Sequence, residues 1–197
     1  MAYTSCAADI AANIAPDCAN PLVSGYTGRA VLFPVGGGAT FVADATNPRI
    51  ITSITLPGSD KWIVLDNAQI VTPLDGSTSQ SNGDSGRFLF NKQLSFRVPL
   101  RGAGTSKDII EPLTQSATGW FAVVEKRDKV GDGSFEIIGM LQGLRPTADG
   151  IVRNESENGG DVAVTMTCQE AWFECDLFDT DYATTLAAFE AFLNNGL

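Results

Sequence analysis

Two segments with strictly alternating apolar and polar residues constrain the fold of this chain most. Residues 94–101 read LSFRVPLR and residues 161–168 read DVAVTMTC. A period of two places alternate side chains on opposite faces of a strand, so each segment predicts a strand with one buried face. The inward residues of the second segment are expected to be Val162, Val164, Met166 and Cys168.

Six further segments are rich in β-branched and aromatic residues and have the length of strands. They are residues 28–34, 50–56, 61–65, 120–126, 134–141 and 171–177. The turn-forming sequence DKVGDG separates two of them, so residues 120–126 and 134–141 are expected to form a β-hairpin. The apolar parity changes between Cys168 and Ala171, which predicts a bulge or bend at Gln169–Glu170. The fold class predicted is mainly β.

Helical patterns are confined to two segments. Residues 107–116, KDIIEPLTQS, are expected to form a short helix in which Pro112 is tolerated only in the first turn. Near the end of the chain, Asp179 or Thr180 can cap a second helix, and Gly196 can end it. The apolar face of this C-terminal helix is expected to consist of Tyr182, Leu186, Phe189 and Leu193.

The chain has the length of a single domain, because 197 residues can bury one core and no repeat or linker divides them. We expect an N-terminal arm over about residues 1–27 and a C-terminal helical arm over residues 178–197. Residues 73–87, PLDGSTSQSNGDSGR, contain almost nothing apolar and are expected to form a long loop. The candidate assembly residues in this loop are Asp75, Gly76, Asn82, Gly83 and Asp84.

The composition argues against most catalytic and metal-binding chemistry. The chain has no histidine, which excludes histidine-dependent triads, proton transfer and metal ligation. The four cysteines fit neither zinc nor redox spacing, and Cys168 and Cys175 are expected to be buried apolar residues. The Gly-rich residues 35–39 lack the ending of a phosphate-binding loop. We therefore predict no enzymatic activity, no cofactor and no metal site.

The charge balance is acidic, with 13 Lys and Arg against 23 Asp and Glu and a formal net charge of −10. Such a chain repels nucleic acid at long range, although solubility alone also explains the charge. Glu170, Glu174 and Asp176 share one face of a predicted strand, where a glycosidase carboxylate pair and a solvated acidic face are the alternatives. The solvated face is the interpretation we adopt.

Neither a membrane span nor a secretory signal is expected. No apolar run approaches the roughly 20 residues that cross a bilayer. The first residues lack a basic region and carry Asp9 within their apolar stretch. We therefore expect the protein to stay in a cytoplasm until it is assembled.

From residue 94 onward, the order of elements resembles a known family. The segments are LSFRVPLRG, KDIIEPLTQ, WFAVVEKR, VGDGS, FEIIGMLQGL and GGDVAVTMTCQEAWF. Over about half of the chain, this order resembles the tail-tube (major tail) proteins of long-tailed bacteriophages. The resemblance implies two packed antiparallel sheets, a flanking helix, a long extended loop and terminal arms. Together with the helical patterns above, the predicted fold class is a mainly β, sandwich-like or barrel-like pair of antiparallel sheets with a short flanking helix and a C-terminal helix.

The resemblance also implies a mechanical function. Subunits would close into hexameric rings by pairing sheet edges, and stacked rings would form a tube through which DNA passes without specific binding. The implied partners are other copies of the chain and other tail proteins, and the implied location is the virion, after the host cytoplasm. Glu174 and Asp176 are then candidates to face the lumen and repel phosphate, although an outward, solubilising position explains them almost as well.

Two other classes of protein remain alternatives. Another virion part, such as a capsid decoration or head-completion protein, would share the β-rich acidic character. A carbohydrate-binding β-sandwich is suggested by Trp62, Trp120 and Trp172, which we expect mostly in cores because strong strand formers flank them.

Overall fold

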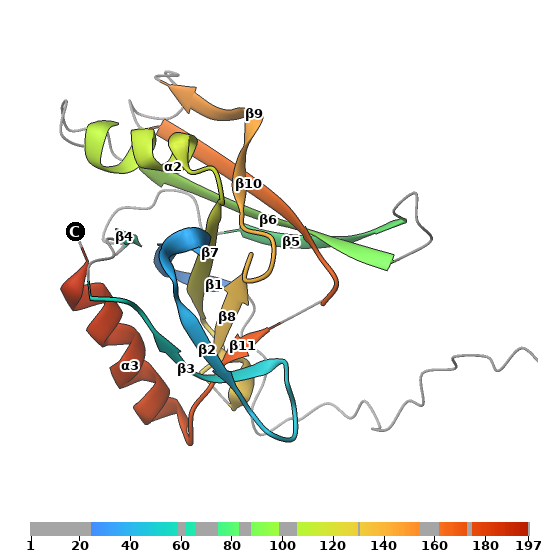
Figure 1. The fold of residues 1–197 in the computed structure, drawn as a ribbon, viewed down its shortest axis with the longest axis vertical. Helices are drawn as coiled ribbons and strands as arrows, with labels where there is room; N and C mark the ends of the chain where they lie inside the picture. Colours follow the sequence, from blue (N-terminus) through green and yellow to red (C-terminus); the bar gives the residue numbers. More distant parts are fainter. Residues whose placement is uncertain are drawn as a thin grey trace, which may run out of the picture.

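The computed structural model describes residues 25–58, 62–65, 75–82, 88–98, 106–129, 131–153, 162–172 and 175–196. These residues form a mainly β fold with two sheets, a short helix and a C-terminal helix, which confirms the predicted fold class (Figure 1).

The larger sheet, sheet A, has seven strands in the order β2-β3-β11-β8-β7-β1-β4. They are β1 (Tyr26–Pro34), β2 (Thr40–Ala43), β3 (Ile50–Thr55), β4 (Ile63–Leu65), β7 (Trp120–Lys126), β8 (Phe135–Ile138) and β11 (Asp176–Leu177). Strands β7 and β8 form the predicted hairpin, with Ala122 opposite Ile138 and Glu125 opposite Phe135. The pairing of β11 with β3 is parallel, so sheet A departs from a purely antiparallel arrangement.

The smaller sheet, sheet B, has four antiparallel strands in the order β5-β6-β10-β9. They are β5 (Asp75–Asn82), β6 (Phe88–Val98), β9 (Arg145–Arg153) and β10 (Val162–Glu170). The two alternating segments of the sequence form its central pair, in which Val164 lies opposite Phe96 and Met166 opposite Leu94. The side chains predicted to point inward from β10 are buried, so the period-two pattern identified the core face of sheet B.

The long loop predicted at residues 73–87 is wrong over most of its length, because residues 75–82 form β5. Every residue of β5 pairs with β6 in continuous register, from Asp75 opposite Ser95 to Asn82 opposite Phe88. A strand at the edge of a sheet needs no apolar face when its partner already covers the core, so its sequence carries no apolar alternation. Asp75, Gly76 and Asn82 therefore lie in a strand, whereas Gly83 and Asp84 lie outside the described residues.

Of the predicted strand at residues 171–177, the described residues pair only at Asp176–Leu177, as β11, and residues 173 and 174 lie outside the described part. Of the bulge or bend predicted at Gln169–Glu170, the bulge is wrong, whereas a bend follows directly at Ala171. Strand β10 continues in regular register to Glu170, which lies opposite Phe90. The parity change marks the passage from sheet B to sheet A, because β10 ends at Glu170 and the buried residues Cys175 and Leu177 lie beside or within β11.

Sheet A is covered on both faces. One face packs against sheet B around residues such as Leu32, Val124 and Met166. The other face packs against the C-terminal helix α3 (Tyr182–Asn195) around Phe33 and Phe189. The molecule therefore has three layers, with sheet A in the middle.

Both predicted helices are present. A π-helical turn, η2 (Ser106–Ile110), leads into α2 (Glu111–Gln115), where Pro112 lies in the first turn as expected. Asp181 caps α3 by accepting a hydrogen bond from the Thr184 N–H at 2.7 Å, so the cap lies one residue beyond the predicted pair. The predicted apolar face of α3 is confirmed, since Tyr182, Leu186, Phe189 and Leu193 all pack in the cluster against sheet A.

Truncation of Phe189 tests the contact between α3 and sheet A. Phe189 is fully buried and its ring lies 5.1 Å from that of Phe135, so Phe189→Ala leaves a cavity. We expect a loss of about 3–5 kcal/mol in the free energy of unfolding, measured by urea denaturation. The matched control, Val42→Ala, truncates a side chain that is 54% exposed and should change the free energy by less than about 0.5 kcal/mol.

Candidate functional site

An ion pair between Lys92 and Glu170 lies inside sheet B, on the face that packs against sheet A. The Lys92 Nζ and Glu170 Oε2 atoms are 2.7 Å apart, and the two side chains are only 2% and 3% exposed. Lys92 comes from β6 and lies directly opposite Cys168 of β10, two residues before Glu170. The two charged side chains are therefore diagonal neighbours on one face of a strand pair.

Glu170 also connects sheet B to the turn that follows β8. Its Oε1 atom accepts a hydrogen bond from the Leu141 N–H at 2.8 Å. Gly139 and Gly143 flank this turn with φ angles of +83° and +76°, in the left-handed region that favours glycine. A Cβ atom at Gly143 would come within 2.5 Å of the Thr118 carbonyl oxygen, so this turn must pack closely against the preceding chain. The carboxylate of Glu170 is thus held from two sides.

The sequence contains a signal for this buried pair, because both residues have the parity of the inward positions of their strands. Lys92 lies two residues before Leu94, the first of the inward residues Leu94, Phe96 and Val98. Glu170 lies two residues after the inward residue Cys168. Glu170 was expected on a solvated acidic face with Glu174 and Asp176, and that expectation is wrong for Glu170. Two opposite charges placed at inward positions of neighbouring strands can each become buried because the other compensates them.

The two described cysteines border this region as buried thiols, as predicted. Burial raises the pKa of Cys168 and of Cys175 to about 12. The Cys175 Sγ atom lies 3.9 Å from the Met140 Sδ atom. Both thiols therefore stay protonated at neutral pH and are poor nucleophiles. Cys6 and Cys18 lie outside the described residues.

A second buried carboxylate, Glu125, joins β7 to β1 on the opposite face of sheet A. Arg29 binds it through two hydrogen bonds, from Nε to Oε2 at 2.7 Å and from Nη2 to Oε1 at 2.8 Å. Thr27 donates a further hydrogen bond to Oε2 at 2.7 Å. Arg29 also lies over the Phe189 ring, 5.7 Å from its centroid, so this pair contacts α3. Its role is to fix the position of the helix on the sheet.

The predicted lumen-facing acids are only partly described. Glu174 lies outside the described residues. Asp176 lies in β11, where its side chain is 18% exposed and its Oδ1 atom is 3.7 Å from Lys126 Nζ. Lys126 also lies 3.6 Å from Glu136, which accepts a hydrogen bond from the Tyr26 hydroxyl at 2.8 Å. Asp176 therefore belongs to a mixed-charge cluster on sheet A.

The outer face of sheet B carries hydroxyl and amide side chains. On β6 and β10 the described residues of this face are Leu89, Asn91, Gln93, Ser95, Arg97, Ala163, Thr165, Thr167 and Gln169. The Ser95 and Thr165 hydroxyls are 3.2 Å apart, and Gln93 donates a hydrogen bond to Ser95 at 3.2 Å. Arg97 is the one charged residue in this set, so this surface of the two strands contains no carboxylate.

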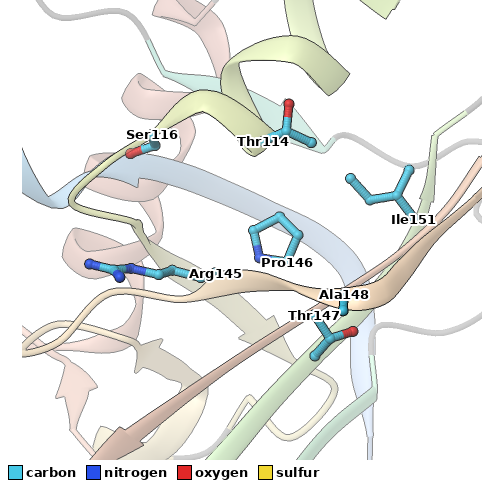
Figure 2. Close-up of a pocket in the computed structure, with 7 residues that line it drawn as sticks. All are labelled: Thr114, Ser116, Arg145, Pro146, Thr147, Ala148 and Ile151. Carbon is cyan, nitrogen blue, oxygen red and sulfur yellow. The ribbon is translucent and has the colours of Figure 1, made fainter.

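A hollow of about 510 Å³ lies between the end of α2 and strand β9 (Figure 2). Its lining residues are Thr114, Ser116, Arg145, Pro146, Thr147, Ala148 and Ile151. Arg145, the charged residue among them, donates a hydrogen bond from Nη2 to the Ala117 carbonyl at 2.9 Å. The hollow thus combines short polar side chains with a cation that already has an acceptor, which does not define a catalytic arrangement.

The tryptophans lie within the packed layers. Trp120 is 5% exposed, and Trp62 donates a hydrogen bond from Nε1 to the Phe192 carbonyl at 2.8 Å. Trp172 is partly buried against the core beneath α3. The expectation that these rings lie mostly in cores is therefore confirmed, which weakens the case for a sugar-stacking surface.

Within the described segments, no group of three or more Cys, Asp or Glu side chains could hold a metal ion. No helix in those segments has the length and apolar character needed to cross a membrane. Comparison with protein-family models, curated proteins and solved structures found no significant match to this chain. The function is therefore inferred from the edges and faces of the two sheets and from the buried charged residues.

The pH dependence of stability tests the Arg29–Glu125 pair. Burial opposes ionisation of Glu125, but the hydrogen bonds from Arg29 and Thr27 outweigh it and lower the pKa of Glu125 below its ordinary value of 4.5. A carboxyl whose pKa is lowered by folding stabilises the fold above its unfolded pKa and loses that contribution as the pH falls. Glu125→Gln should therefore cost about 3 kcal/mol at pH 7 and progressively less below about pH 4.5, measured by urea denaturation.

The control for this experiment is Glu190→Gln. Glu190 is the second carboxylate near Arg29, at 3.6 Å, but its side chain is 48% exposed. The Glu190→Gln substitution should change the free energy of unfolding by less than about 1 kcal/mol. An effect of Glu125→Gln that stays constant from pH 7 to pH 3 would show that its ionisation does not stabilise the fold.

Proposed function

We propose that this chain is a structural subunit that assembles with copies of itself into rings, and that the rings stack into a tube like those of phage tails. The observation that carries the proposal is the regular, polar edge strand β5, which the β5–β6 hairpin projects away from the three-layered body (Figure 1). Beyond β6, β5 pairs with no other described strand. An edge of this kind is a template for pairing with another chain.

The other sheet edges are less suited to pairing. In sheet A, the edge strands β2 and β4 contain only four and three residues. In sheet B, β9 contains Pro146 and loses regular pairing with β10 between Met166 and Val164. Strand β5 has eight residues in unbroken register and no proline. It is the longest uninterrupted edge in the described part of the chain.

The topology of sheet B is compatible with a closed ring. Each of its three strand pairs is antiparallel, so the edge strands β5 and β9 run in opposite directions. Strand β5 of one copy can therefore pair with β9 of the next in antiparallel orientation, and repetition of this contact closes a ring. The regularly paired end of β9, Ile151–Arg153, is the segment that we expect to receive the neighbour.

In such a ring, we propose that the outer face of sheet B lines the channel. Its hydroxyl and amide groups are neutral and hydrogen-bond one another, as Ser95 does with Thr165 and Gln93. With Arg97 as its one charged side chain on the described parts of β6 and β10, this wall gives DNA phosphates few cationic contacts to bind. This proposal differs from an acidic lumen formed by Glu174 and Asp176, since Asp176 lies beside Lys126 on sheet A.

A capsid decoration or head-completion protein is the second candidate. It would use the same open edge without forming stacked rings. Electron microscopy of the purified protein distinguishes the two, because a tube subunit forms rings or tubes on its own. Carbohydrate binding is less well supported, since the Nε1 atom of Trp62 is engaged by the backbone and Trp120 is buried.

Two proline substitutions in β5 test the assembly edge. Neighbouring residues of an edge strand direct their N–H groups to opposite sides, so Ser79→Pro and Gln80→Pro remove one donor toward β6 and one away from it. We expect one of the two variants to keep the thermal stability of the wild type and to sediment as a monomer. The wild type should sediment as rings or longer polymers whose share grows with concentration.

The matched control is Val42→Lys on edge strand β2 of sheet A, which should leave assembly intact. Both proline variants polymerising normally would exclude β5 as the contact. A wild type that remains monomeric at every concentration would contradict the proposed function itself.

Charge added to the outer face of sheet B tests the channel. Thr165 and Thr167 point outward from β10, so a Thr165→Lys/Thr167→Lys variant places repeated cations on that face. Assembled tubes of this variant should retain duplex DNA at low salt and release it as salt rises, measured by co-sedimentation. Tubes of Asp176→Lys serve as the comparison. Stronger DNA retention by the Asp176 variant would favour the sheet A face as the channel wall.

A further inference from the structure

The Lys92–Glu170 contact has an unusual combination of closeness and poor hydrogen bonding. The Nζ and Oε2 atoms are 2.7 Å apart. Nevertheless, Nζ has no hydrogen-bond partner of acceptable geometry among the described residues. The Lys92 amine is therefore in close contact with the Glu170 carboxyl group, but the geometry of this contact is not that of a hydrogen bond.

Burial makes this arrangement costly as an ion pair. Both side chains are at least 97% buried according to their exposed fractions of 2% and 3%. A buried pair compensates its desolvation only when its remaining donors and acceptors are satisfied. Here the ammonium donors are not satisfied, so a product without either charge would suit the site better.

We infer that Lys92 and Glu170 condense to an intramolecular amide, an isopeptide bond that joins β6 to β10. This inference does not depend on the proposed function, because it follows from one buried contact. The bond would be a self-catalysed modification of the chain and would form once, after folding brings the two strands together.

The reaction balances without an oxidant, a cofactor or another substrate. A proton passes from Nζ to Oε2, which leaves a neutral amine beside a neutral carboxylic acid. The Nζ lone pair then adds to Cδ, and the electron pair of the Cδ–Oε1 double bond moves onto Oε1. A second proton moves from Nζ to Oε2, the Cδ–Oε2 bond breaks and water leaves. The Cδ–Oε1 double bond reforms as the amide carbonyl.

The surroundings of Glu170 support the addition of the amine to its carboxyl group. The Leu141 N–H donates to Oε1 at 2.8 Å, on the atom that carries negative charge in the tetrahedral intermediate. The turn that supplies this N–H is held by Gly139 and Gly143 in their left-handed conformations. Fixing amine and acid in contact gives effective concentrations on the order of 10⁵–10⁸ M. Exclusion of solvent also protects the amide from hydrolysis.

The thiol of Cys168 competes little for the Glu170 carboxyl group. Cys168 lies directly opposite Lys92 on β10, within the same buried region. Its thiol stays protonated because burial raises its pKa to about 12. The amine of Lys92 is therefore the nucleophile placed against the Glu170 carboxyl group.

The intact mass of the purified full-length protein tests this inference. Denaturing electrospray mass spectrometry should give a mass lower than that of the sequence by one water molecule. Trypsin should no longer cut after Lys92, and it should release a branched product in which residues 88–97 are joined to residues 154–197. Fragmentation of this product should place the junction at Lys92 and Glu170.

Two controls make the result specific. Lys92→Arg keeps the positive charge but lacks the amine, so this variant should have its full calculated mass. Lys126 and Glu136 form a looser and more exposed pair at 3.6 Å, and their peptides should remain unlinked in the wild type.

Three outcomes would overturn the inference. They are a wild type with its full calculated mass, cleavage after Lys92, and a loss of water located elsewhere. Asp75–Gly76, Asp132–Gly133 and Asp149–Gly150 are the sites to check for the last outcome, because Asp-Gly sequences also lose water by cyclisation. None of these outcomes depends on assembly, so failure here leaves the ring proposal untouched.

Discussion

Burial of sheet A on both faces is the constraint on which the rest of the structure depends. Strands β1 and β7 lie side by side near its centre, and Ala30, Val31, Leu32 and Phe33 are completely buried. A sheet of this kind must have a second layer on each side, which sheet B and α3 provide. The apolar residues of β7 therefore form a nearly continuous run, whereas β6 and β10 alternate because only one of their faces is covered.

The two carboxylates that form buried ion pairs lie at or near the ends of their strands. Glu125 lies near the end of β7 and Glu170 at the end of β10, and each has a cation from a neighbouring strand. Both positions are inward, so each carboxylate would be strongly unfavourable without its partner. The two pairs also reach beyond their own strand pair, since Arg29 contacts α3 and Glu170 binds the turn after β8. They fix the relative positions of the three layers in a way that apolar packing alone does not.

These differences explain which features could be predicted from the sequence. Strands β6 and β10 were predicted because one buried face produces alternation, and α3 because one apolar stripe meets sheet A. Strand β5 was not predicted, because its sequence DGSTSQSN has no apolar alternation, whereas its place in the sheet is defined by backbone pairing with β6. The Lys92–Glu170 pair was also missed, because charged residues were expected to point outward. Each charge is compensated by a residue of the neighbouring strand, and neither segment alone shows this.

The contrast between the two sheets also indicates where function can reside. Sheet A has a packed layer on each face and short edge strands, so it offers a partner less regular edge than sheet B does. Sheet B uses one face for the core and leaves a polar face and the regular edge β5 available. A subunit that bears load through sheet B needs its central strands to stay together when neighbouring copies pull on its edges. Lys92 and Glu170 connect those two strands, β6 and β10. Their contact lies on the buried face of sheet B, so it leaves the outer face free for a channel or a neighbouring copy.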